Sequence, residues 1–301
     1  MSSTGATPVP VAAGSLSRAF ACVALVKPDV TFLVVLTTLA GFYLGSTGPV
    51  NVLAMFHAVF GTMLVAGGTA ALNQYIERAS DAKMRRTSLR PLPIGVLRPS
   101  EALAFGAGLL VLGSVYLALL TNWLACVLAL LTAALYLGVY TPLKTRTTLA
   151  TAIGAIPGAI PPLIGWAAAR GSLHGGAWLL FAILFLWQFP HFHAIAWMYR
   201  EDYARAGIRM LPVTDRNGSA TFGQIIFAAA ALLPVSLLPS VTGLAGLRYF
   251  FGALMIGILL VQVCLWAARS RTNLRAKWLM HSTVVHIPLL FGLLMFDKVV
   301  R

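Results

Sequence analysis

The residues of this chain whose types could do chemistry are densest at 73–93, NQYIERASDAKMRRTSLRPLP. Asn73, Glu77 and Asp81 are spaced four residues apart, so a helix places their oxygen atoms on one face. Mg²⁺ takes oxygen ligands of this kind from proteins. Basic residues beside carboxylates, at the end of an apolar run, favour a magnesium-bridged phosphate ligand. The basic residues that follow the acids are Lys83, Arg85, Arg86 and Arg90.

These basic residues also have a plainer interpretation, as the polybasic flank that marks the inner leaflet of a membrane. That interpretation leaves Glu77 and Asp81 unexplained, because acidic side chains at the edge of an apolar segment are costly unless they are used. The two acids therefore favour a phosphate site. Pro91 and Pro93 force the chain out of helix beyond it.

A second group of charged and aromatic residues lies in YREDYARAG, at 199–207. We expect Asp202 to complete the metal site from across the protein, with Arg200 and Tyr203 contacting the substrate. An ion pair of Asp202 with Arg200 or Arg205 explains the same residues equally simply.

Two lysines are further candidates for binding the phosphate ligand. Lys144 ends the motif YTPLK between two apolar segments, and Lys83 lies in the basic stretch described above. Each could instead be an orientation charge of the kind that flanks membrane helices.

The stretch 184–197, LFLWQFPHFHAIAW, combines Gln188 with two histidines around Pro190. Polar groups beside a proline in an apolar span favour a ligand cavity, and we expect the proline to interrupt the helix. His191 and His193 differ by about 200° around a helix, so they face one ligand together only if the helix unwinds. One of the two is therefore expected to be structural.

The strongly apolar composition indicates the class of protein that holds these residues in place. The chain has 301 residues, of which 59% are hydrophobic and only 10% are charged. Apolar runs near the roughly 20-residue spanning length recur throughout, which predicts an all-α polytopic membrane protein. We expect a disordered tail at 1–18 and a single transmembrane domain at 19–301. The nine predicted spans are 30–44, 52–72, 102–120, 123–140, 149–169, 177–199, 220–241, 249–268 and 278–296.

The net charge of +14 indicates orientation rather than a nucleic-acid partner. Most of the 22 Lys and Arg residues fall in loops on the same side as the N-terminus, which predicts that this side is cytoplasmic. The acidic residues gather on the same side, as a polar site facing the cytoplasm requires. The cysteines have no metal-binding spacing and are expected to be core residues: Cys22, Cys126 and Cys264.

On these residues the chain resembles the heme O synthases (protoheme IX farnesyltransferases), a branch of the UbiA-type intramembrane prenyltransferases. The resemblance covers nearly the whole chain. Its most specific parts are the stretch 73–93, YTPLK with IGAIPGAIPPLIGW, and LWQFPHF with YREDYARAGI. The second and third groups separate this branch from prenyltransferases that act on quinone or chlorophyll precursors. The resemblance implies a bundle of about nine helices around a central cavity.

The resemblance further implies farnesyl diphosphate as donor, heme B as acceptor and Mg²⁺ as cofactor. Loss of diphosphate yields an allylic cation, the heme vinyl group attacks it, and water adds to give a hydroxyethylfarnesyl group. The matching positions imply that Mg²⁺-diphosphate is bound at 73–90, while His191 is the candidate heme contact. The site residues so expected are the metal ligands Asn73, Glu77, Asp81 and Asp202, the catalytic residues Glu77, Asp81, Arg86, Arg90 and Lys144, and the substrate contacts Asn73, Lys83, Arg200, His191, His193 and Tyr203.

The chain departs from the wider superfamily at three positions. Gln74 and Glu77 stand where aspartate is typical, which fits the heme branch. Ala206 stands four residues after Asp202, so the second acidic motif lacks its partner carboxylate. One dominant metal cluster is therefore expected rather than two symmetric ones.

These inferences predict a farnesyltransferase that makes heme O for terminal oxidases. We expect it in a bacterial inner membrane, in preference to the mitochondrial inner membrane, with heme A synthase or oxidase assembly factors as partner proteins. The alternatives are a related prenyltransferase acting on a quinone or chlorophyll precursor, and a membrane carrier.

Overall fold

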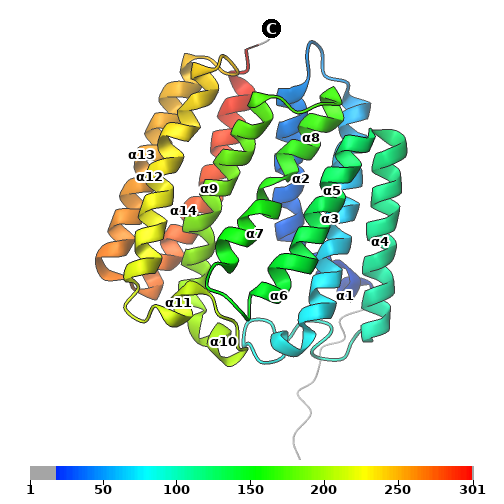
Figure 1. Cartoon of the computed structure of the whole chain (residues 1–301), viewed down its shortest axis with the longest axis vertical. Coiled ribbons are helices and arrows are strands. Elements are labelled where there is room, and N and C mark those ends of the chain that lie inside the picture. The colour runs from blue at the N-terminus through cyan, green and yellow to red at the C-terminus, as the bar shows by residue number, and fades with distance from the viewer. Residues whose placement is uncertain (1–17, 300–301) are drawn as a thin grey trace, which may run out of the picture.

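A computed structural model describes residues 18–299 as a bundle of helices with roughly parallel axes (Figure 1). Within this range nine helical segments are long and apolar enough to cross a membrane, which confirms the nine predicted spans. The protein is an integral membrane protein. The spans are α2 (Pro28–Gly45), α3 (Val52–Asp81), α4 (Pro99–Leu120), α5 with η1 and α6 (Trp123–Leu143), α7 with α8 (Ala150–Arg170), α9 (Gly175–Met198), α12 (Ser219–Val241), α13 (Leu247–Ser270) and α14 (Asn273–Phe296).

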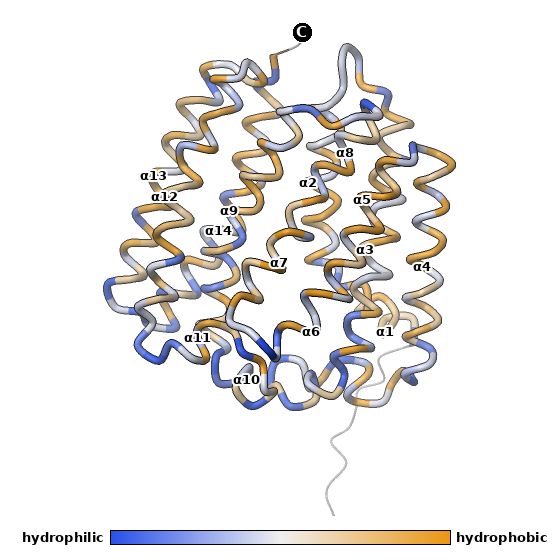
Figure 2. Tube along the Cα trace, viewed as in Figure 1, coloured by the Kyte–Doolittle hydropathy of each residue, from blue (hydrophilic) through white to orange (hydrophobic). Residues whose placement is uncertain are grey.

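Hydrophilic residues gather at one end of the bundle, called the charged end below, which carries the segments 82–98, 144–149 and 199–218 (Figure 2). Two short helices, α10 (Arg200–Arg205) and α11 (Leu211–Thr214), belong to it. The expected disordered tail lies outside the described residues except for Arg18, which begins the short helix α1 (Arg18–Leu25).

Two spans differ from expectation in ways that affect the site. Helix α3 continues nine residues past the predicted boundary, as far as Asp81, so the acidic motif forms its last turns. Helix α9 runs unbroken through Pro190, so the predicted interruption is wrong. A single proline removes one backbone hydrogen bond, and packing of the helix on its neighbours offsets that loss.

The proline-rich fifth span does break, as its sequence indicates. It consists of α7 (Ala150–Ala159) and α8 (Pro161–Arg170), joined at Ile160. Helix α8 packs closely on α2 through glycines: a Cβ on Gly165 would lie 1.9 Å from the carbonyl oxygen of Thr38, and one on Gly41 would lie 2.1 Å from that of Pro162. Small residues allow such approach where apolar burial cannot drive helices together.

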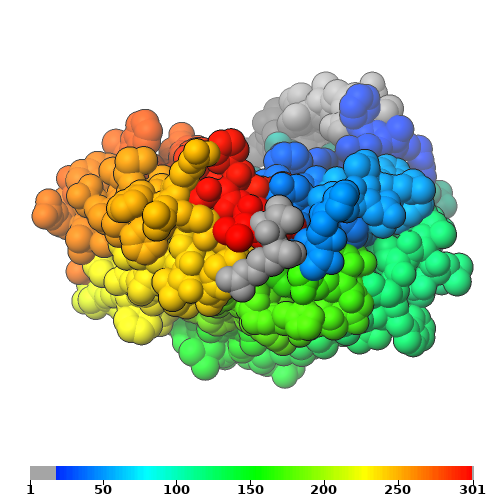
Figure 3. All heavy atoms as spheres, turned by 90° about the horizontal axis from the view of Figure 1, so that it is seen from above, coloured from blue at the N-terminus to red at the C-terminus, as the bar shows by residue number. Residues whose placement is uncertain are grey.

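The last span closes the bundle against the first. Helix α14 contacts α2, α9 and α13. Seen from the end opposite the charged one, α14 (red) lies between the blue N-terminal segments and the yellow and orange helices α12 and α13 (Figure 3). Cys126 and Cys264 are buried free thiols and Cys22 is partly buried, in keeping with their expected core role.

Candidate functional site

The end of α3 presents its predicted face of oxygen atoms to cations from distant parts of the chain. Oε1 of Glu77 accepts a hydrogen bond from Nζ of Lys144 at 2.8 Å. Oδ2 of Asp81 accepts one from Nη1 of Arg90 at 2.7 Å, and Asp81 is only 1% exposed. Asn73, two turns earlier, is fully buried. The structure therefore gathers five of the predicted site residues at the charged end.

A lysine whose position before a span is typical of an orientation charge also belongs to this group. Nζ of Lys27, at the junction of α1 and α2, donates to Oδ1 of Asn73 at 2.7 Å. The side-chain amide of Asn73 donates in turn to Oγ1 of Thr141 at 3.1 Å. Burial, with help from the charges of Arg90 and Lys144, lowers the pKa of Lys27 to about 7. A lysine before a span looks the same in sequence whether it marks orientation or enters a site.

A π-helical turn, η1 (Leu135–Tyr140), shapes the surroundings of Lys144. Such turns are rare and are frequently found at functional sites. Nζ of Lys144 lies 4.3 Å from the ring centroid of Tyr140 and 5.8 Å from that of Tyr136. Burial alone lowers the pKa of Lys144, but the two tyrosine oxygens and the Glu77 carboxylate outweigh it, so the pKa lies above its usual range. The ammonium group is therefore a permanent cation beside aromatic faces.

Asp202 joins the site through the loop that follows α3. Its Oδ2 accepts a hydrogen bond from the backbone N–H of Arg86 at 3.3 Å. Its Oδ1 accepts one from Arg205, which is the ion pair that was the alternative interpretation of this residue. The Arg86 guanidinium donates to the hydroxyl of Tyr203 at 3.1 Å and lies over the rings of Tyr203 and Tyr199. The expected ion pair of Asp202 with Arg205 is therefore present, and Asp202 also contacts the loop that follows α3.

The ion pairs at this end do not include all of its basic side chains. Glu77, Asp81 and Asp202 each pair with one cation. Within the described part of the chain, neither the Lys27 ammonium nor the Arg86 guanidinium forms an ion pair with a carboxylate. An anion that enters the group therefore meets two basic side chains, Lys27 and Arg86, to which the described residues offer no directly paired carboxylate.

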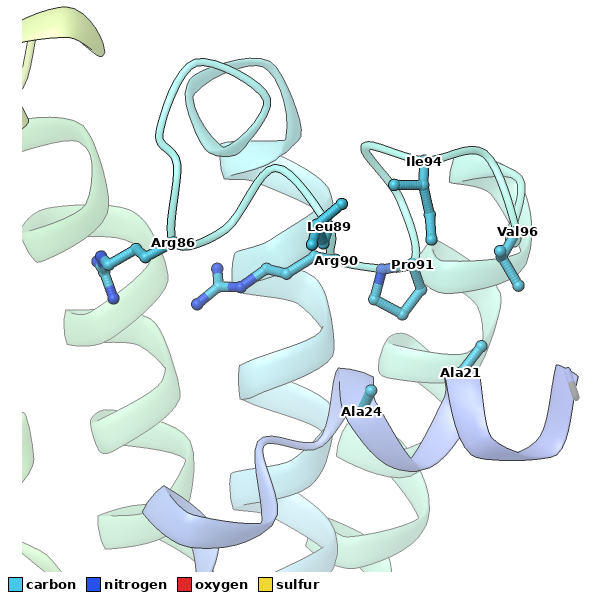
Figure 4. A pocket seen from close by; sticks show the side chains of 8 residues that line it. All are labelled: Ala21, Ala24, Arg86, Leu89, Arg90, Pro91, Ile94 and Val96. Atoms are coloured by element: carbon cyan, nitrogen blue, oxygen red, sulfur yellow. The ribbon is translucent and has the colours of Figure 1, made fainter. Parts of the chain in front are cut away.

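A cavity of about 240 Å³ opens beside these arginines, between α1 and the loop 82–98. Figure 4 shows Arg86 and Arg90 reaching to one side of it, with Ile94 and Val96 on the other side and Ala21 of α1 lying against the loop. The cavity is thus charged at one end and apolar along the rest, which suits a charged head group on a lipid-soluble molecule.

Two predicted contacts lie apart from this group. Lys83 is exposed in the loop after α3. Arg200 turns toward α14, where its Nη1 donates to Oδ1 of Asn273 and to the carbonyl oxygen of Trp197, both at 2.7 Å. The structure does not bring either residue to the acids of α3.

The two histidines of α9 face different helices, as their angular separation predicts. Nδ1 of His191 lies 2.9 Å from Oγ1 of Thr283 on α14, and its ring stacks on Trp187. Nε2 of His193 lies 2.9 Å from Oε1 of Gln224 on α12, and its side chain is fully buried. His193 therefore ties α9 to α12.

The hydroxyl of Thr283 fixes the tautomer of His191. Its one proton goes to the carbonyl oxygen of Met280, 2.6 Å away, so in the contact with His191 the imidazole Nδ1–H is the donor. Nε2 then carries the lone pair and can accept a proton donor or bind a metal.

Comparison of the sequence with known proteins gives one family. The model of the UbiA prenyltransferase family matches residues 34–285. A protoheme IX farnesyltransferase of Solibacter usitatus is 47% identical over 91% of this chain and 97% of its own. One of Koribacter versatilis is 45% identical over 92% of each chain, and one of Salinibacter ruber is 44% identical over 91% of this chain and 96% of its own.

Solved structures share the fold at low sequence identity. A digeranylgeranylglyceryl phosphate synthase structure aligns with a TM-score of 0.76 and 18% identity over 93% of this chain and 98% of its own. A UbiA homolog from Archaeoglobus fulgidus bound to GPP and Mg²⁺ aligns with a TM-score of 0.63 and 14% identity over 91% and 99%. The predicted all-α, nine-span bundle of UbiA type is thereby confirmed.

Proposed function

The chain belongs to the UbiA prenyltransferase family, and from this membership we propose that it transfers the farnesyl group of farnesyl diphosphate to a vinyl group of heme B. The products are diphosphate and, after addition of water, heme O. The single observation that carries the proposal is the gathering of an amide, three carboxylates and their surrounding cations at one end of the bundle. The donor and acceptor follow the names of relatives that are 44–47% identical.

The cations of the charged end would bind the diphosphate and stabilise it as it leaves. The allylic C–O bond breaks with both electrons going to the diphosphate, so negative charge builds up on phosphate oxygens. Lys144, Arg86 and Arg90 supply fixed positive charge there, and charge-assisted hydrogen bonds of this kind are the strong ones. The rings of Tyr136 and Tyr140 lie beside Lys144, whose side chain is only 12% exposed.

The same end fits Mg²⁺. The available donors are hard oxygen atoms, from Asn73, Glu77, Asp81 and, across the loop, Asp202. Within residues 18–299 there is no group of three or more acidic, histidine or cysteine side chains that could hold a metal ion. Mg²⁺ does not require such a group, because it is usually bound by one or two carboxylates together with substrate phosphates and water. When bound, the ion would offset phosphate charge. In the ligand-free structure, the side-chain oxygen of each of the three α3 residues accepts a hydrogen bond from the side-chain nitrogen of a basic residue. These oxygens therefore already face positively charged groups.

The acceptor would then supply the new bond. The vinyl π electrons of heme attack the allylic carbon, and the heme-side cation so formed takes up water and loses a proton. His191 remains the candidate heme contact, with its Nε2 lone pair left available by Thr283. His193 is bonded to Gln224 and supports α12 instead.

We further propose that the charged end faces the cytoplasm of a bacterial cell, in its inner membrane. Basic residues concentrate in the loops of this end, as the positive-inside rule requires of a cytoplasmic face. The donor's diphosphate would meet the protein from the same side.

Incubation of the purified protein with heme B, farnesyl diphosphate and Mg²⁺ tests the proposal, with the product read by mass spectrometry. A parallel reaction offers an aromatic quinone precursor instead of heme B. The proposal predicts farnesylated heme only in the first reaction. Product from the quinone precursor alone would make the chain a prenyltransferase of the quinone type.

A further inference from the structure

A second cavity, of about 330 Å³, lies between α7, α9 and α12 and shares no lining residue with the site at the end of α3. Its lining residues fall within 148–152, 185–189 and 224–228, together with Leu211 of α11. Figure 1 shows α7 and α12 on either side of α9, with α11 at the charged end of this group. The cavity therefore extends from the charged end into the part of the bundle that crosses the membrane.

The walls that α9 and α12 give this cavity are aromatic. Phe185 and Phe189, one turn apart on α9, line it with their ring centroids 5.3 Å from each other. Helix α12 adds Phe227, which is 75% exposed. His191 lies about 200° further around α9 than Phe189, so the candidate heme contact faces another side of the helix. The walls therefore fit an apolar chain, at a place that the candidate heme contact does not face.

One polar side chain in the cavity has hydrogen-bond donors without a partner. Gln224 of α12 lines the cavity, and its Oε1 lies 2.9 Å from Nε2 of the buried His193. Nδ1 of His193 is buried and has no partner. A buried N–H is rarely left unpaired, so Nε2 carries the imidazole proton and donates it to Gln224. Both N–H groups of the Gln224 amide then remain without an acceptor among the described residues, which favours a ligand that carries an acceptor oxygen.

The end of the cavity near α11 carries positive charge. Arg209 precedes the lining residue Leu211 by two positions, is exposed, and forms no ion pair within the described part of the chain. Its backbone N–H donates to the carbonyl oxygen of Lys144 at 2.7 Å, so it lies beside the segment that leads into α7. Gln224 lies further in, about 8 Å along α12 from its first residue. From the charged end inward, the cavity thus offers a cation, hydrogen-bond donors and an apolar wall.

We propose that this cavity binds one anionic phospholipid from the leaflet at the charged end. Arg209 binds the phosphate of the head group, as basic residues between spanning helices bind lipid head groups. The amide of Gln224 donates to an ester carbonyl oxygen, and one acyl chain lies along Phe185 and Phe189. The site is separate from that of the proposed reaction, and its lipid is not consumed.

Native mass spectrometry of the delipidated full chain tests this by titration with phosphatidylglycerol. Phosphatidylcholine with the same acyl chains is the neutral comparison. We expect wild type to bind one phosphatidylglycerol about fivefold more tightly than phosphatidylcholine, which is the usual effect of a single basic residue at an anionic membrane surface. Bound phosphatidylglycerol should also raise the melting temperature, because a ligand of the folded state stabilises it.

Three variants separate the parts of the site. Ala152→Phe fills the cavity from α7 and should weaken binding of both lipids at least about tenfold, because no room is left for the chain. Arg209→Gln should remove the preference for phosphatidylglycerol and leave binding of phosphatidylcholine unchanged. Gln224→Leu should weaken binding of both lipids about fivefold, the usual cost of losing a neutral hydrogen bond.

The matched controls are Ala104→Phe, which adds the same ring at an exposed position of α4, and Lys277→Gln, which removes an exposed cation in the first turn of α14. Both should bind each lipid as wild type does. Thermal unfolding of every variant without added lipid shows whether it is folded. If Ala152→Phe does not fold, Gln224→Leu and Arg209→Gln decide, since both change exposed side chains.

Wild-type lipid binding in a folded Ala152→Phe or in Gln224→Leu would overturn the proposal, and so would equal weakening by Ala104→Phe. Equal affinities of wild type for the two lipids would overturn the assignment of an anionic head group. Displacement of phosphatidylglycerol by farnesyl diphosphate would assign the cavity to the prenyl donor instead. None of these titrations contains heme, so their outcome does not depend on the proposed reaction.

Discussion

Nζ of Lys144 lies 2.8 Å from Oε1 of Glu77, although 67 residues separate the two in the chain. Their side chains are 12% and 15% exposed, so the pair is largely shielded from solvent. The contact joins the end of α3 to the start of the segment 144–149, which precedes the fifth span. It also brings a predicted phosphate-binding cation directly onto a predicted metal ligand.

This pair gives the first prediction. Lys144→Met should lower kcat about 10²-fold, because it removes one fixed charge from the leaving diphosphate and leaves Glu77 without its cation. The matched control is Arg146→Met, two residues on, since Arg146 is exposed. Steady-state rates with heme B and farnesyl diphosphate measure both variants. Equal rates for Lys144→Met and Arg146→Met would remove Lys144 from the site.

The buried pair of Asp81 and Arg90 gives the second prediction. Asp81→Ala and Arg90→Ala should each abolish turnover while the protein still inserts in the membrane, because both charges lie at the proposed diphosphate site. Breaking a buried ion pair also costs stability, about 3–5 kcal/mol. Activity and membrane-fraction yield are measured together. Wild-type turnover in either variant would exclude that residue.

The third prediction separates the two histidines of α9. His191→Ala should weaken heme binding more than farnesyl diphosphate binding, since Nε2 of His191 is the available lone pair. Thr283→Val should weaken heme binding to a smaller extent, because without the Thr283 hydroxyl the tautomer of His191 is no longer fixed. His193→Ala should instead lower thermal stability, by loss of the bond to Gln224. Absorbance titration measures heme binding, calorimetric titration measures farnesyl diphosphate binding, and thermal unfolding measures stability. Greater weakening of farnesyl diphosphate binding than of heme binding in His191→Ala would refute the assignment of His191.

The fourth prediction concerns the packing of α8 on α2. Gly165→Ala should destabilise the fold by at least about 1–3 kcal/mol, the usual cost of overpacking, because its Cβ would meet the backbone oxygen of Thr38 at 1.9 Å. Gly108→Ala on α4 is the control, since nothing lies within 4 Å of a Cβ there. Thermal unfolding in detergent compares them. Equal melting temperatures would contradict the close approach.

The spans could be predicted from the sequence because a bilayer imposes a minimum apolar length on every helix. The end of α3 could not be placed by the same rule, since its last turns from Asn73 to Asp81 are polar. Cations from distant parts of the chain compensate the polar groups of those residues, and the length of an apolar segment gives no information about such contacts. Continuity of α9 through Pro190 likewise depends on neighbouring helices.

Members of the candidate site could be predicted from the sequence where residue type and spacing indicate a ligand. They could not be predicted where only a tertiary contact brings the residue to the site. Glu77 and Asp81 could be predicted from their spacing. The position of Lys27 beside Asn73 depends instead on a left-handed backbone conformation, which no sequence motif predicts. Arg200 looked the same as Arg86 in sequence, yet α10 directs it to Asn273 on α14. The direction of a side chain on a short helix is set by tertiary packing.

If this chain joins farnesyl to a heme vinyl group with addition of water, one experiment can follow both new bonds. Purified protein is given heme B, farnesyl diphosphate and Mg²⁺ in ¹⁸O-labelled water, and the heme product is analysed by mass spectrometry. We expect a heme that carries one farnesyl group and one ¹⁸O atom. Unmodified heme, with farnesyl diphosphate left intact or merely hydrolysed, would contradict it.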